Sequence, residues 1–366
     1  MEVVIAEKYN AAQKIASILC DHNPNRTSLY DTPVFEWDDT RVVGLAGHIV
    51  ETDFGEGYAE WSDCHPSELI SAPIEKKPSK PDLVNAVESL GKKADTVIIA
   101  TDYDREGELI GTEAYEIINS VNSSVSVERA LFSSLTPKEV GSAFNNTKSL
   151  DRELAAAGEA RQRIDLRWGA SLTRFLTLLA ERNDGIISVG RVQTPTLKIV
   201  VDREREIEDF DPDPYWEIYT SFNTQNNQQS FEAMYFYYDE EDNQAERIWK
   251  EKRSKAIVSD IDNALNGTVT GVDVSTRNDN PPIPFNTTEF IKAANAIGYE
   301  AKPAMSIAES LYDDGYITYP RTDNTVYPDD MDENAILSSL RNVRELQDDV
   351  DVIQGQESLD PTRGDE

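Results

Sequence analysis

The sequence has few cysteines and no long apolar run. Its 366 residues include only two cysteines, Cys20 and Cys64, which lie far apart and form no CxxC pair. This excludes a ribbon-type zinc site built on thiolates and is typical of a reducing cytoplasm. No apolar run approaches the ~18 residues of a membrane span, and the amino terminus lacks the basic and apolar blocks of a signal peptide. We therefore expect a cytoplasmic protein with no membrane partner.

Positive charge is also scarce. The chain has 35 Lys and Arg residues against 68 Asp and Glu residues, which gives a formal net charge of -33. Such self-repulsion destabilises a compact chain unless concentrated salt screens it. The charge therefore predicts a halophilic protein. The alternative is an acidic protein that mimics nucleic acid or binds histones, but periodic apolar patterning along the chain disfavours it.

Residues 152–205 reverse this charge balance, with ten basic and seven acidic residues. The apolar periodicity in this region is helical. One interpretation is a helical region crossed by ion pairs. The other is a surface that faces the phosphates of a nucleic acid. Composition alone leaves both open.

Acidic residues cluster directly after an apolar run at residues 97–100, which predicts a buried parallel strand. The acids that follow it, as the chain turns into a helix, are Asp102, Asp104, Glu106 and Glu108. Carboxylates this close repel one another, and a hard divalent cation such as Mg²⁺ relieves the repulsion. Glu7 follows another such run, residues 3–6, and ligands bind outside the carboxyl ends of parallel strands. The alternative is an acidic helix start that suits the helix dipole.

The remaining segments alternate between helical and strand patterns. Residues 71–82 are polar and Pro-rich, which predicts a link, and residues 129–132 predict a strand. Thr136 and Pro137 predict the start of a helix. His48 follows a glycine, and a lone histidine of this kind is more often structural than a metal ligand. Residues 214–276, including the run at 267–272, alternate as strands do, and helices are expected again at 287–297 and 303–313.

The segment around Tyr319 gives this tyrosine unusual neighbours. Pro320 stiffens the chain directly after it, and Arg321 lies two residues on. A tyrosine hydroxyl has a pKa of ~10, so as a nucleophile it needs nearby positive charge or a base. An arginine can grip a phosphate and stabilise charge during phosphoryl transfer. Tyr319 and Arg321 are therefore candidates for that chemistry.

Four motifs, in order, resemble those of the type IA DNA topoisomerases, closest to the archaeal topoisomerase and topoisomerase III branch. They are Glu7-Lys8, Asp102-x-Asp104-x-Glu106, the segment SVGRVQTP at Ser188–Pro195, and Tyr319-Pro-Arg-Thr-Asp323. The first resembles the opening of a Toprim domain, although Tyr9 and Asn10 replace the usual Pro-Ser. Other Toprim proteins, such as primases, OLD-type nucleases and recombination mediators, share the acidic triad but lack the last two motifs.

The resemblance implies a multidomain protein of α/β, α and β parts. A Toprim domain with a Rossmann-like parallel sheet would be followed by segments of the type IA topoisomerase core. We predict the Toprim domain at residues 1–150 and the first part of a helical DNA-binding domain at 151–209. The first part of a β-rich arch is predicted at 210–278, and a helical domain that carries the tyrosine at 279–366.

The resemblance also implies an isomerase that breaks and rejoins single-stranded DNA. Tyr319 would attack a backbone phosphate and form a 5′-phosphotyrosine link. Another strand would pass through the gap before the 3′-hydroxyl reseals it, which relaxes negative supercoils without ATP. Arg321 and Lys8 would contact the phosphate, and Glu7 would manage the proton on the 3′ oxygen.

The cofactor and DNA contacts are implied in the same way. Asp102, Asp104 and Glu106 would hold Mg²⁺, which positions the strand. The residues implied to line the single-strand groove or to support the tyrosine loop are Arg161, Asp165, Gly190, Arg191, Gln193, Thr322 and Asp323. DNA binding of this kind implies a location at the nucleoid.

One element of the family pattern is missing from the sequence. The family has a histidine beyond the tyrosine that assists at the phosphate, whereas this chain has only His22, His48 and His65, all upstream. We therefore expect a truncated chain or half of a split enzyme, with a second chain supplying the missing segments. The alternative is a catalytically incomplete fragment that binds single-stranded DNA.

This expectation predicts that the 366-residue chain alone relaxes DNA poorly or not at all. The measurement is an agarose-gel assay of negatively supercoiled plasmid in high salt with Mg²⁺. Robust relaxation by this chain would contradict the prediction.

Overall fold

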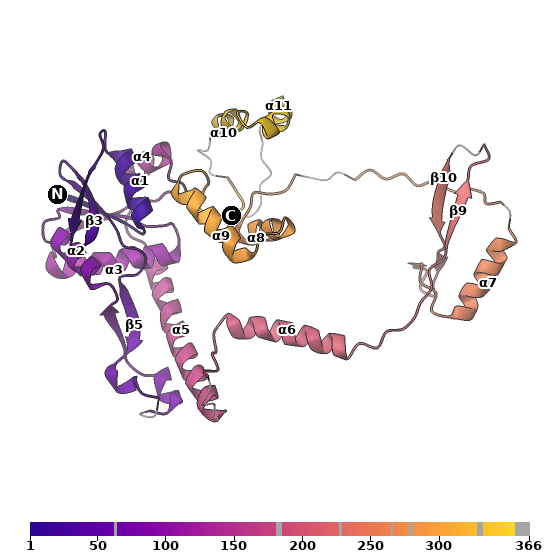
Figure 1. The fold of residues 1–366 in the computed structure, drawn as a ribbon, viewed down its shortest axis with the longest axis horizontal. Helices are drawn as coiled ribbons and strands as arrows, with labels where there is room; N and C mark the ends of the chain where they lie inside the picture. Colours follow the sequence, from indigo (N-terminus) through magenta and orange to yellow (C-terminus); the bar gives the residue numbers. More distant parts are fainter. Residues whose placement is uncertain are drawn as a thin grey trace. The chain divides into compact units, whose positions relative to one another are not determined.

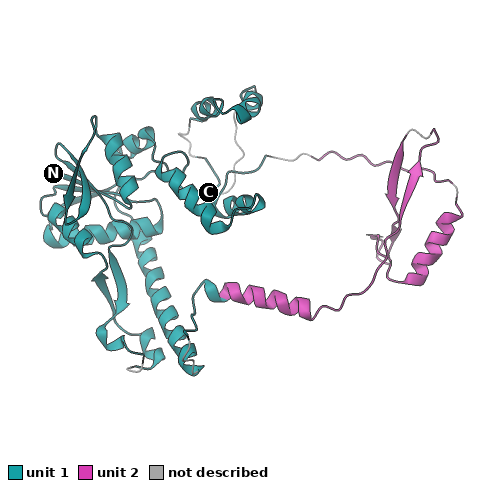
Figure 2. Ribbon diagram, in the orientation of Figure 1, with its two compact units in different colours: residues 1–194, 280–366 teal, residues 195–279 magenta. Residues whose placement is uncertain are grey.

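The computed structural model describes residues 1–61, 64–180, 185–226, 229–264, 266–277, 281–327 and 332–355 (Figure 1). The chain forms two compact units (Figure 2). Unit 1 comprises Met1–Thr194 with Asn280–Glu366, and unit 2 comprises Pro195–Asp279. Within the described ranges, no helix is both long enough and apolar enough to cross a membrane.

A six-stranded sheet forms the centre of unit 1, with the strand order β2-β3-β4-β1-β7-β8. Its strands are β1 (Glu2–Ala6), β2 (Asn25–Leu29), β3 (Thr32–Trp37), β4 (Thr40–Gly44), β7 (Thr96–Ala100) and β8 (Ser126–Arg129). β1 is parallel to β4 and β7, and β7 is parallel to β8, whereas β2, β3 and β4 pair antiparallel. The strands predicted at residues 3–6 and 97–100 are confirmed, and they are direct neighbours with Ala6 opposite Ala100.

Helices accompany this sheet. Those described in unit 1 are α1 (Tyr9–Leu19), α2 (Pro81–Gly91), α3 (Arg105–Val121), α4 (Pro137–Asn145), α5 (Arg152–Leu179), α8 (Thr287–Ala296), α9 (Ala301–Asp313), α10 (Glu333–Leu340) and α11 (Gln347–Gln354). Short 3₁₀ helices are η1 (Glu56–Tyr58), η2 (Pro66–Ile70) and η3 (Arg344–Leu346). The helices expected near residues 287–297 and 303–313 are thus present as α8 and α9.

The strand β1 is apolar on both faces because helices cover both sides of the sheet. Side chains alternate between the two faces along a strand. Val4 and Ala6 join one core cluster with residues of α1 and α4, and Tyr312 and Tyr319 belong to it. Val3 and Ile5 join the other cluster, with residues of α2 and α3. Burial on both faces explains why the sequence shows a continuous apolar run instead of alternation.

The Pro-rich segment at residues 71–82 is not the irregular link that was predicted. It contains β6 (Ile74–Pro78), which pairs antiparallel with β5 (Val50–Phe54). Its prolines stand before the strand, at the last residue of the strand and in the first turn of α2. A proline lacks an N–H but is tolerated at such positions, where no hydrogen bond from that N–H is needed.

Two predictions at the edge of the sheet have different outcomes. The strand predicted at residues 129–132 is wrong in its position, because β8 runs from Ser126 to Arg129. Beyond Arg129 the chain leaves the sheet, although Phe132 is buried there. The predicted start of α4 is confirmed, since Oγ1 of Thr136 accepts a hydrogen bond from the N–H of Glu139 at 3.4 Å.

Unit 2 contains strands and helices. Its elements are β9 (Tyr219–Asn223), β10 (Ser230–Met234), β11 (Tyr237–Tyr238), β12 (Gln244–Ala245), α7 (Glu251–Asp262) and most of α6 (Gln193–Glu208). β9 and β10 form an antiparallel pair, as the alternating pattern predicted. Two expectations are wrong: α7 lies inside the segment read as strands, and no strand is present in the described range 266–277. Val269 and Val272 there are exposed, so alternation without a pairing strand does not produce a sheet.

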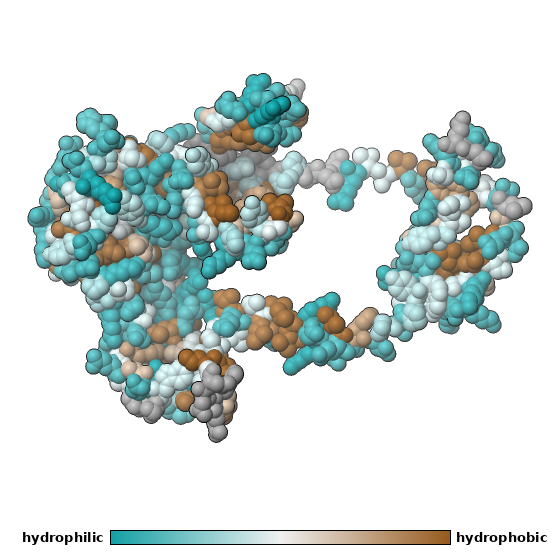
Figure 3. Space-filling model, in the orientation of Figure 1, coloured by the Kyte–Doolittle hydropathy of each residue, from teal (hydrophilic) through white to brown (hydrophobic). Residues whose placement is uncertain are grey.

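The acidic surface predicts a salt-dependent fold. Acidic runs such as residues 239–242 are exposed, and hydrophilic side chains cover much of the visible surface around the sheet in Figure 3. Raising KCl from about 0.1 M to about 1 M shortens the Debye length from ~10 Å to ~3 Å and weakens the repulsion. We expect the melting temperature to rise by at least roughly 4 °C, which corresponds to about 1–2 kcal/mol.

The measurement is thermal unfolding followed by circular dichroism. A sucrose series serves as the control for excluded-solute effects, which do not depend on charge. An unchanged or falling melting temperature across the KCl series would show that repulsion does not limit the stability of this chain.

Candidate active site

Two loops that carry acidic residues meet at the carboxyl ends of β1 and β7. Glu7 and Lys8 follow β1, and Asp102 follows β7. The backbone N–H of Asp102 donates to Oε2 of Glu7 at 3.4 Å, and Nζ of Lys8 lies 3.5 Å from Oδ2 of Asp102. Neighbouring parallel strands end at the same edge of a sheet. The structure therefore brings Glu7 and Asp102 together, as expected.

Asp104 caps the amino-terminal end of α3. Its Oδ1 accepts a hydrogen bond from the N–H of Gly107 at 2.7 Å. A Cβ atom on Gly107 would lie 2.2 Å from the carbonyl oxygen of Asp102, so a larger residue cannot fit here without a shift. Asp104 therefore has the helix-start role that was the alternative to a metal site. The two roles are compatible, because its other oxygen, Oδ2, faces a different partner.

That partner is Tyr319, 215 residues away in the sequence. The hydroxyl of Tyr319 donates to Oδ2 of Asp104 at 2.6 Å, and its backbone N–H donates to the carbonyl of Ser133 at 2.8 Å. Tyr312 donates its hydroxyl to Oδ1 of Asp102 at 3.3 Å. The two buried tyrosine rings meet edge to face, with centroids 5.2 Å apart. The acidic cluster and the tyrosine, recognised as separate motifs, thus lie side by side.

Burial and mutual repulsion raise the pKa values in this cluster. Burial, followed by the charge of Asp102, raises the pKa of Glu7 to about 7. Burial also raises the pKa of Asp102, and Lys8 opposes this shift only in part. The pKa of Tyr319 is raised by burial and by its hydrogen bond to Asp104. In this arrangement the hydroxyl of Tyr319 is therefore protonated. The positive charge of Lys8 does not fully offset the effect of burial on the acids.

Glu106 is held by His48 and is not grouped with Asp102 and Asp104. Oε1 of Glu106 lies 2.8 Å from Nε2 of His48, and Nδ1 of His48 lies 2.8 Å from Oε2 of Glu113. Burial acts to lower the pKa of His48, but its hydrogen bonds to Glu113 and Glu106 outweigh this and raise the pKa to about 9. Within the described ranges, no three or more His, Cys, Asp or Glu side chains are arranged to hold a metal ion.

Arg321 is exposed beside the tyrosine loop. Its Nε donates to Oε1 of Glu309, on α9, at 2.8 Å. Thr322 is fixed by hydrogen bonds with Thr287. Its N–H donates to Oγ1 of Thr287 at 2.9 Å, and its carbonyl accepts from the N–H and Oγ1 of Thr287 at 2.9 and 3.1 Å. Asp323 is exposed. The predicted motif is therefore a loop anchored to the start of α8, with its arginine turned towards a glutamate.

The predicted groove residues form a second group. Arg161 and Asp165 lie on α5, and Nε of Arg191 lies 2.7 Å from Oδ1 of Asp165, whose Oδ2 lies 3.8 Å from Nε of Arg161. Gly190 directly precedes Arg191, and Oε1 of Gln193 accepts a hydrogen bond from Ser188 at 3.3 Å. The side chains of Arg161, Asp165 and Arg191 are about half exposed, so the two guanidinium groups can reach a ligand in solvent.

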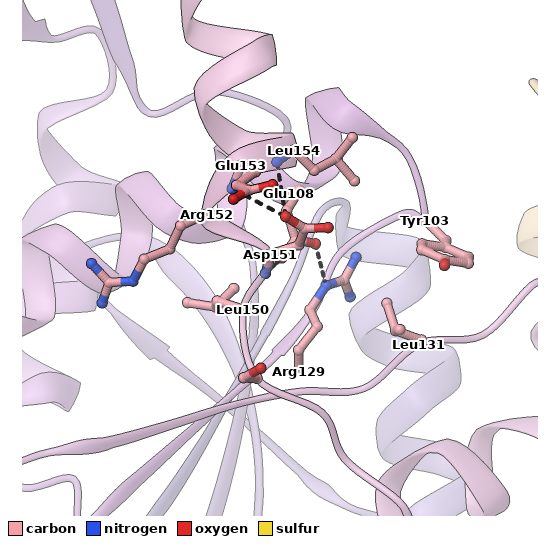
Figure 4. A pocket seen from close by; sticks show the side chains of 10 residues that line it. Tyr103, Glu108, Arg129, Leu131, Leu150, Asp151, Arg152, Glu153 and Leu154 are labelled. Atoms are coloured by element: carbon pink, nitrogen blue, oxygen red, sulfur yellow. Dashed lines mark hydrogen bonds and ion pairs between the residues drawn. The ribbon is translucent and has the colours of Figure 1, made fainter.

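Glu108 faces away from the other acids, contrary to its grouping with them in the sequence. It forms a buried ion pair with Arg129 in the pocket of Figure 4, with Nε of Arg129 2.7 Å from its Oε2. Arg129 also donates to the carbonyl oxygens of Thr101 and Asp102, at 2.9 and 3.0 Å. Oε1 of Glu108 accepts from the N–H of Asp151 at 2.7 Å. The pair thus supports the backbone of the acidic loop from behind.

Sequence reasoning missed several of these supporting residues. Arg129 was read only as part of a strand, although a lone arginine in an apolar segment was a signal for a buried partner. Glu309 and Tyr312 lie three residues apart on a predicted helix just before the tyrosine segment, and that spacing places them on one face. Glu113 gave no signal, because an acid inside a helix of so acidic a chain is ordinary.

Comparison with known proteins agrees with this geometry. Residues 149–363 match the DNA topoisomerase family, and residues 2–135 match the Toprim domain. The chain belongs to the type IA DNA topoisomerase family. Its fold class, a Toprim-type parallel sheet with a helical topoisomerase core, is confirmed. The predicted domain boundaries at residues 150, 209 and 278 stay predictions.

Several topoisomerases are similar along nearly the whole chain. DNA topoisomerase 1 of Archaeoglobus fulgidus is 42% identical over 99% of this chain and 52% of that protein. DNA topoisomerase 3 of Candidozyma auris is 32% identical over 90% of this chain and 54% of that protein. The structure of full-length topoisomerase I from Thermotoga maritima aligns with a TM-score of 0.63 at 25% identity, covering 93% of this chain and 52% of that one. The chain spans about half the length of the curated relatives it matches.

The Toprim domain is a metal-binding domain, and the acidic residues of this topoisomerase chain fit a hard divalent cation. Asp102 and Asp104 supply carboxylate oxygens, which are the ligands that a hard divalent cation prefers. Burial and mutual repulsion raise the pKa values of Glu7 and Asp102, and the charge of Lys8 offsets these shifts only in part. A cation beside them would remove this repulsion. Glu106 would join the ligands only after leaving His48.

The close approach at Gly107 gives a test of the site's architecture. Gly107→Ala should lower the free energy of unfolding by about 1–3 kcal/mol, because its Cβ overlaps the Asp102 carbonyl. Gly57→Ala is the matched control, because a Cβ there meets nothing within 4 Å. Thermal and urea unfolding of both variants measure the difference. Equal stabilities would mean that the acidic loop does not need its close approach to α3.

Proposed function

We propose that this chain carries the DNA cleavage site of a type IA topoisomerase, in which Tyr319 attacks a backbone phosphate of single-stranded DNA. The observation that supports this best is the 2.6 Å hydrogen bond from Tyr319 to Asp104 at the acidic edge of the sheet. Acids that repel one another beside a tyrosine are a costly arrangement for a purely structural core. A phosphate and a cation would together relieve that cost.

The cleavage step exchanges one phosphorus–oxygen bond for another. The Tyr319 oxygen bonds to phosphorus while the bond from phosphorus to the 3′ oxygen breaks. The products are a 5′-phosphotyrosine link and a free 3′-hydroxyl. Asp104 would accept the phenolic proton, and Glu7, with its pKa near 7, would protonate the leaving 3′ oxygen. Rejoining reverses these steps, and the retained phosphodiester energy makes ATP unnecessary.

Two basic side chains would contact the phosphate. Lys8 lies beside Asp102, inside the cluster, with its side chain 37% exposed and therefore accessible to a ligand. Arg321 is paired with Glu309, but both side chains are open to solvent. An exposed ion pair contributes only about 0–1 kcal/mol, so a phosphate can replace Glu309 as the partner of Arg321. Mg²⁺ held by Asp102, Asp104 and Glu106 would add positive charge that orients the phosphate.

The DNA strand would run along the group formed by α5 and the SVGRVQTP segment. Asp165 pairs with both Arg161 and Arg191 and so holds their guanidinium groups close together. In concentrated salt, backbone contacts lose most of their counterion-release contribution, so hydrogen bonds and stacking should dominate binding. The further residues in this proposed contact surface are Gly190, Gln193, Thr322 and Asp323.

Strand passage through the gap would then relax negatively supercoiled DNA. This activity is proposed for the protein of which the described units form part. The alternative that remains is a chain that binds single-stranded DNA without cleaving it, and the cleavage assay separates the two.

The decisive test traps the covalent product. A single-stranded oligonucleotide labelled at its 3′ end is incubated with the chain, and the reaction is quenched with denaturant. A 5′-phosphotyrosine link leaves the labelled fragment on the protein, which shifts it on a denaturing gel. We expect Tyr319→Phe to abolish the labelled band, because phenylalanine has no oxygen to bond to phosphorus.

Tyr316→Phe is the matched control, since this tyrosine lies in the same loop and is 77% exposed. It should give the same band as the unmodified chain. A band that persists in Tyr319→Phe would refute the proposed nucleophile. Binding of the oligonucleotide without any band would favour the non-catalytic alternative.

A further inference from the structure

Each acid of the Asp102, Asp104 and Glu106 triad is engaged by a different side chain. Asp102 accepts from Tyr312, and Asp104 accepts from Tyr319. Tyr319 is the proposed nucleophile, and Tyr312 lies on α9 just before the tyrosine segment. The partner of Glu106 is His48, which has no part in the proposed steps. The role of that contact is a separate question.

His48 is fixed in place from three directions. Its loop is anchored because the N–H of Gly47 donates to the carbonyl of Glu7 at 3.0 Å. Its Nδ1 faces Glu113, whose side chain is only 2% exposed. The Gln162 side-chain amide lies 3.1 Å from Nε2 on the other side. A buried carboxylate needs a hydrogen-bonded partner, so Glu113 holds the imidazole in one orientation.

The fixed imidazole directs Nε2 at Glu106. Glu106 lies in the first turn of α3 and its side chain is 44% exposed, so it has room to change rotamer. With its carboxylate on His48, the described residues contain no group of three acids that could hold a metal ion. Glu106 can therefore face His48 or a cation beside Asp102 and Asp104, but it cannot serve both fully.

We propose that His48 is a positioning residue that holds Glu106 away from the cation site, so that cation binding must compete with this contact. The inference rests on the proposed cation site at Asp102, Asp104 and Glu106. It also links that site to the proposed DNA surface, because Gln162 lies between Arg161 and Asp165 on α5 and contacts His48. A strand bound on α5 would therefore act on the residue that retains Glu106.

The test measures Mn²⁺ binding to the whole chain without DNA, by the loss of the free-ion signal in electron paramagnetic resonance. His48→Asn keeps an amide near the position of Nδ1 for Glu113 but cannot reach Glu106. It should tighten Mn²⁺ binding about two- to fivefold, as expected when a partly exposed charged contact no longer competes. His48→Gln, whose longer amide reaches the position of Nε2, should restore the affinity of the unmodified chain. His22→Asn, at an exposed histidine, is the neutral control.

A double variant shows whether His48 acts through Glu106. Glu106→Gln should weaken Mn²⁺ binding, and adding His48→Asn to it should cause no further change. Equal tightening in both backgrounds, or no tightening in either, overturns the proposal, as does a chain that binds no Mn²⁺. If His48→Asn does not fold by circular dichroism, Glu113→Gln serves instead, because it removes the buried charge behind the imidazole and should also tighten binding.

The outcome is independent of the cleavage assay. Tyr319→Phe can fail to change the covalent product while the Mn²⁺ cycle still supports His48, and the reverse can also occur. The two proposals therefore stand or fall on separate measurements.

Discussion

Repulsion between carboxylates at the ends of β1 and β7 is the constraint on which the site depends. Parallel neighbours in the sheet bring Glu7 and Asp102 to one edge, and the start of α3 adds Asp104. Lys8 forms an ion pair with Asp102, but its charge opposes the effect of burial on that acid only in part. The fold tolerates them because two hydroxyl donors, Tyr312 of α9 and Tyr319 of the tyrosine segment, are hydrogen-bonded to them.

This arrangement couples the proposed nucleophile to the state of the acids. While the Tyr319 hydroxyl donates a hydrogen bond to Asp104, it lowers the free-energy cost of the buried carboxylate. In this state Tyr319 keeps its proton and is a poor nucleophile. A cation that took over the neutralisation of the acids would make this hydrogen bond less necessary. The same carboxylates would thus restrain the tyrosine in one state and assist it in another.

Much of this site could be predicted from sequence, because its chemistry resides in short motifs after strongly apolar strands. Glu7, Asp102 and Tyr319 were recognised in this way. What could not be predicted depends on tertiary packing: the rotamer of Glu106, the buried pair of Glu108 and the use of Tyr312. In the fold, the parallel strands were clear, whereas β6 and α7 were missed. Composition does not show whether a polar segment will pair with a strand, or whether it will form a helix that packs on a neighbour.

The Arg129–Glu108 pair connects the acidic loop to the start of the long helix α5. Arg129 donates a hydrogen bond to the carbonyl of Asp102, and Glu108 accepts one from the N–H of Asp151, the N-cap residue of α5. A helix of 28 residues is about 42 Å long, and the far half of α5 is held as well, because Arg167 and Arg174 donate to the carbonyls of Ala72 and Tyr58. The acidic loop and the hairpin side of the domain are therefore joined through one helix that is fastened near both ends, so a change at either end is felt as strain at the other.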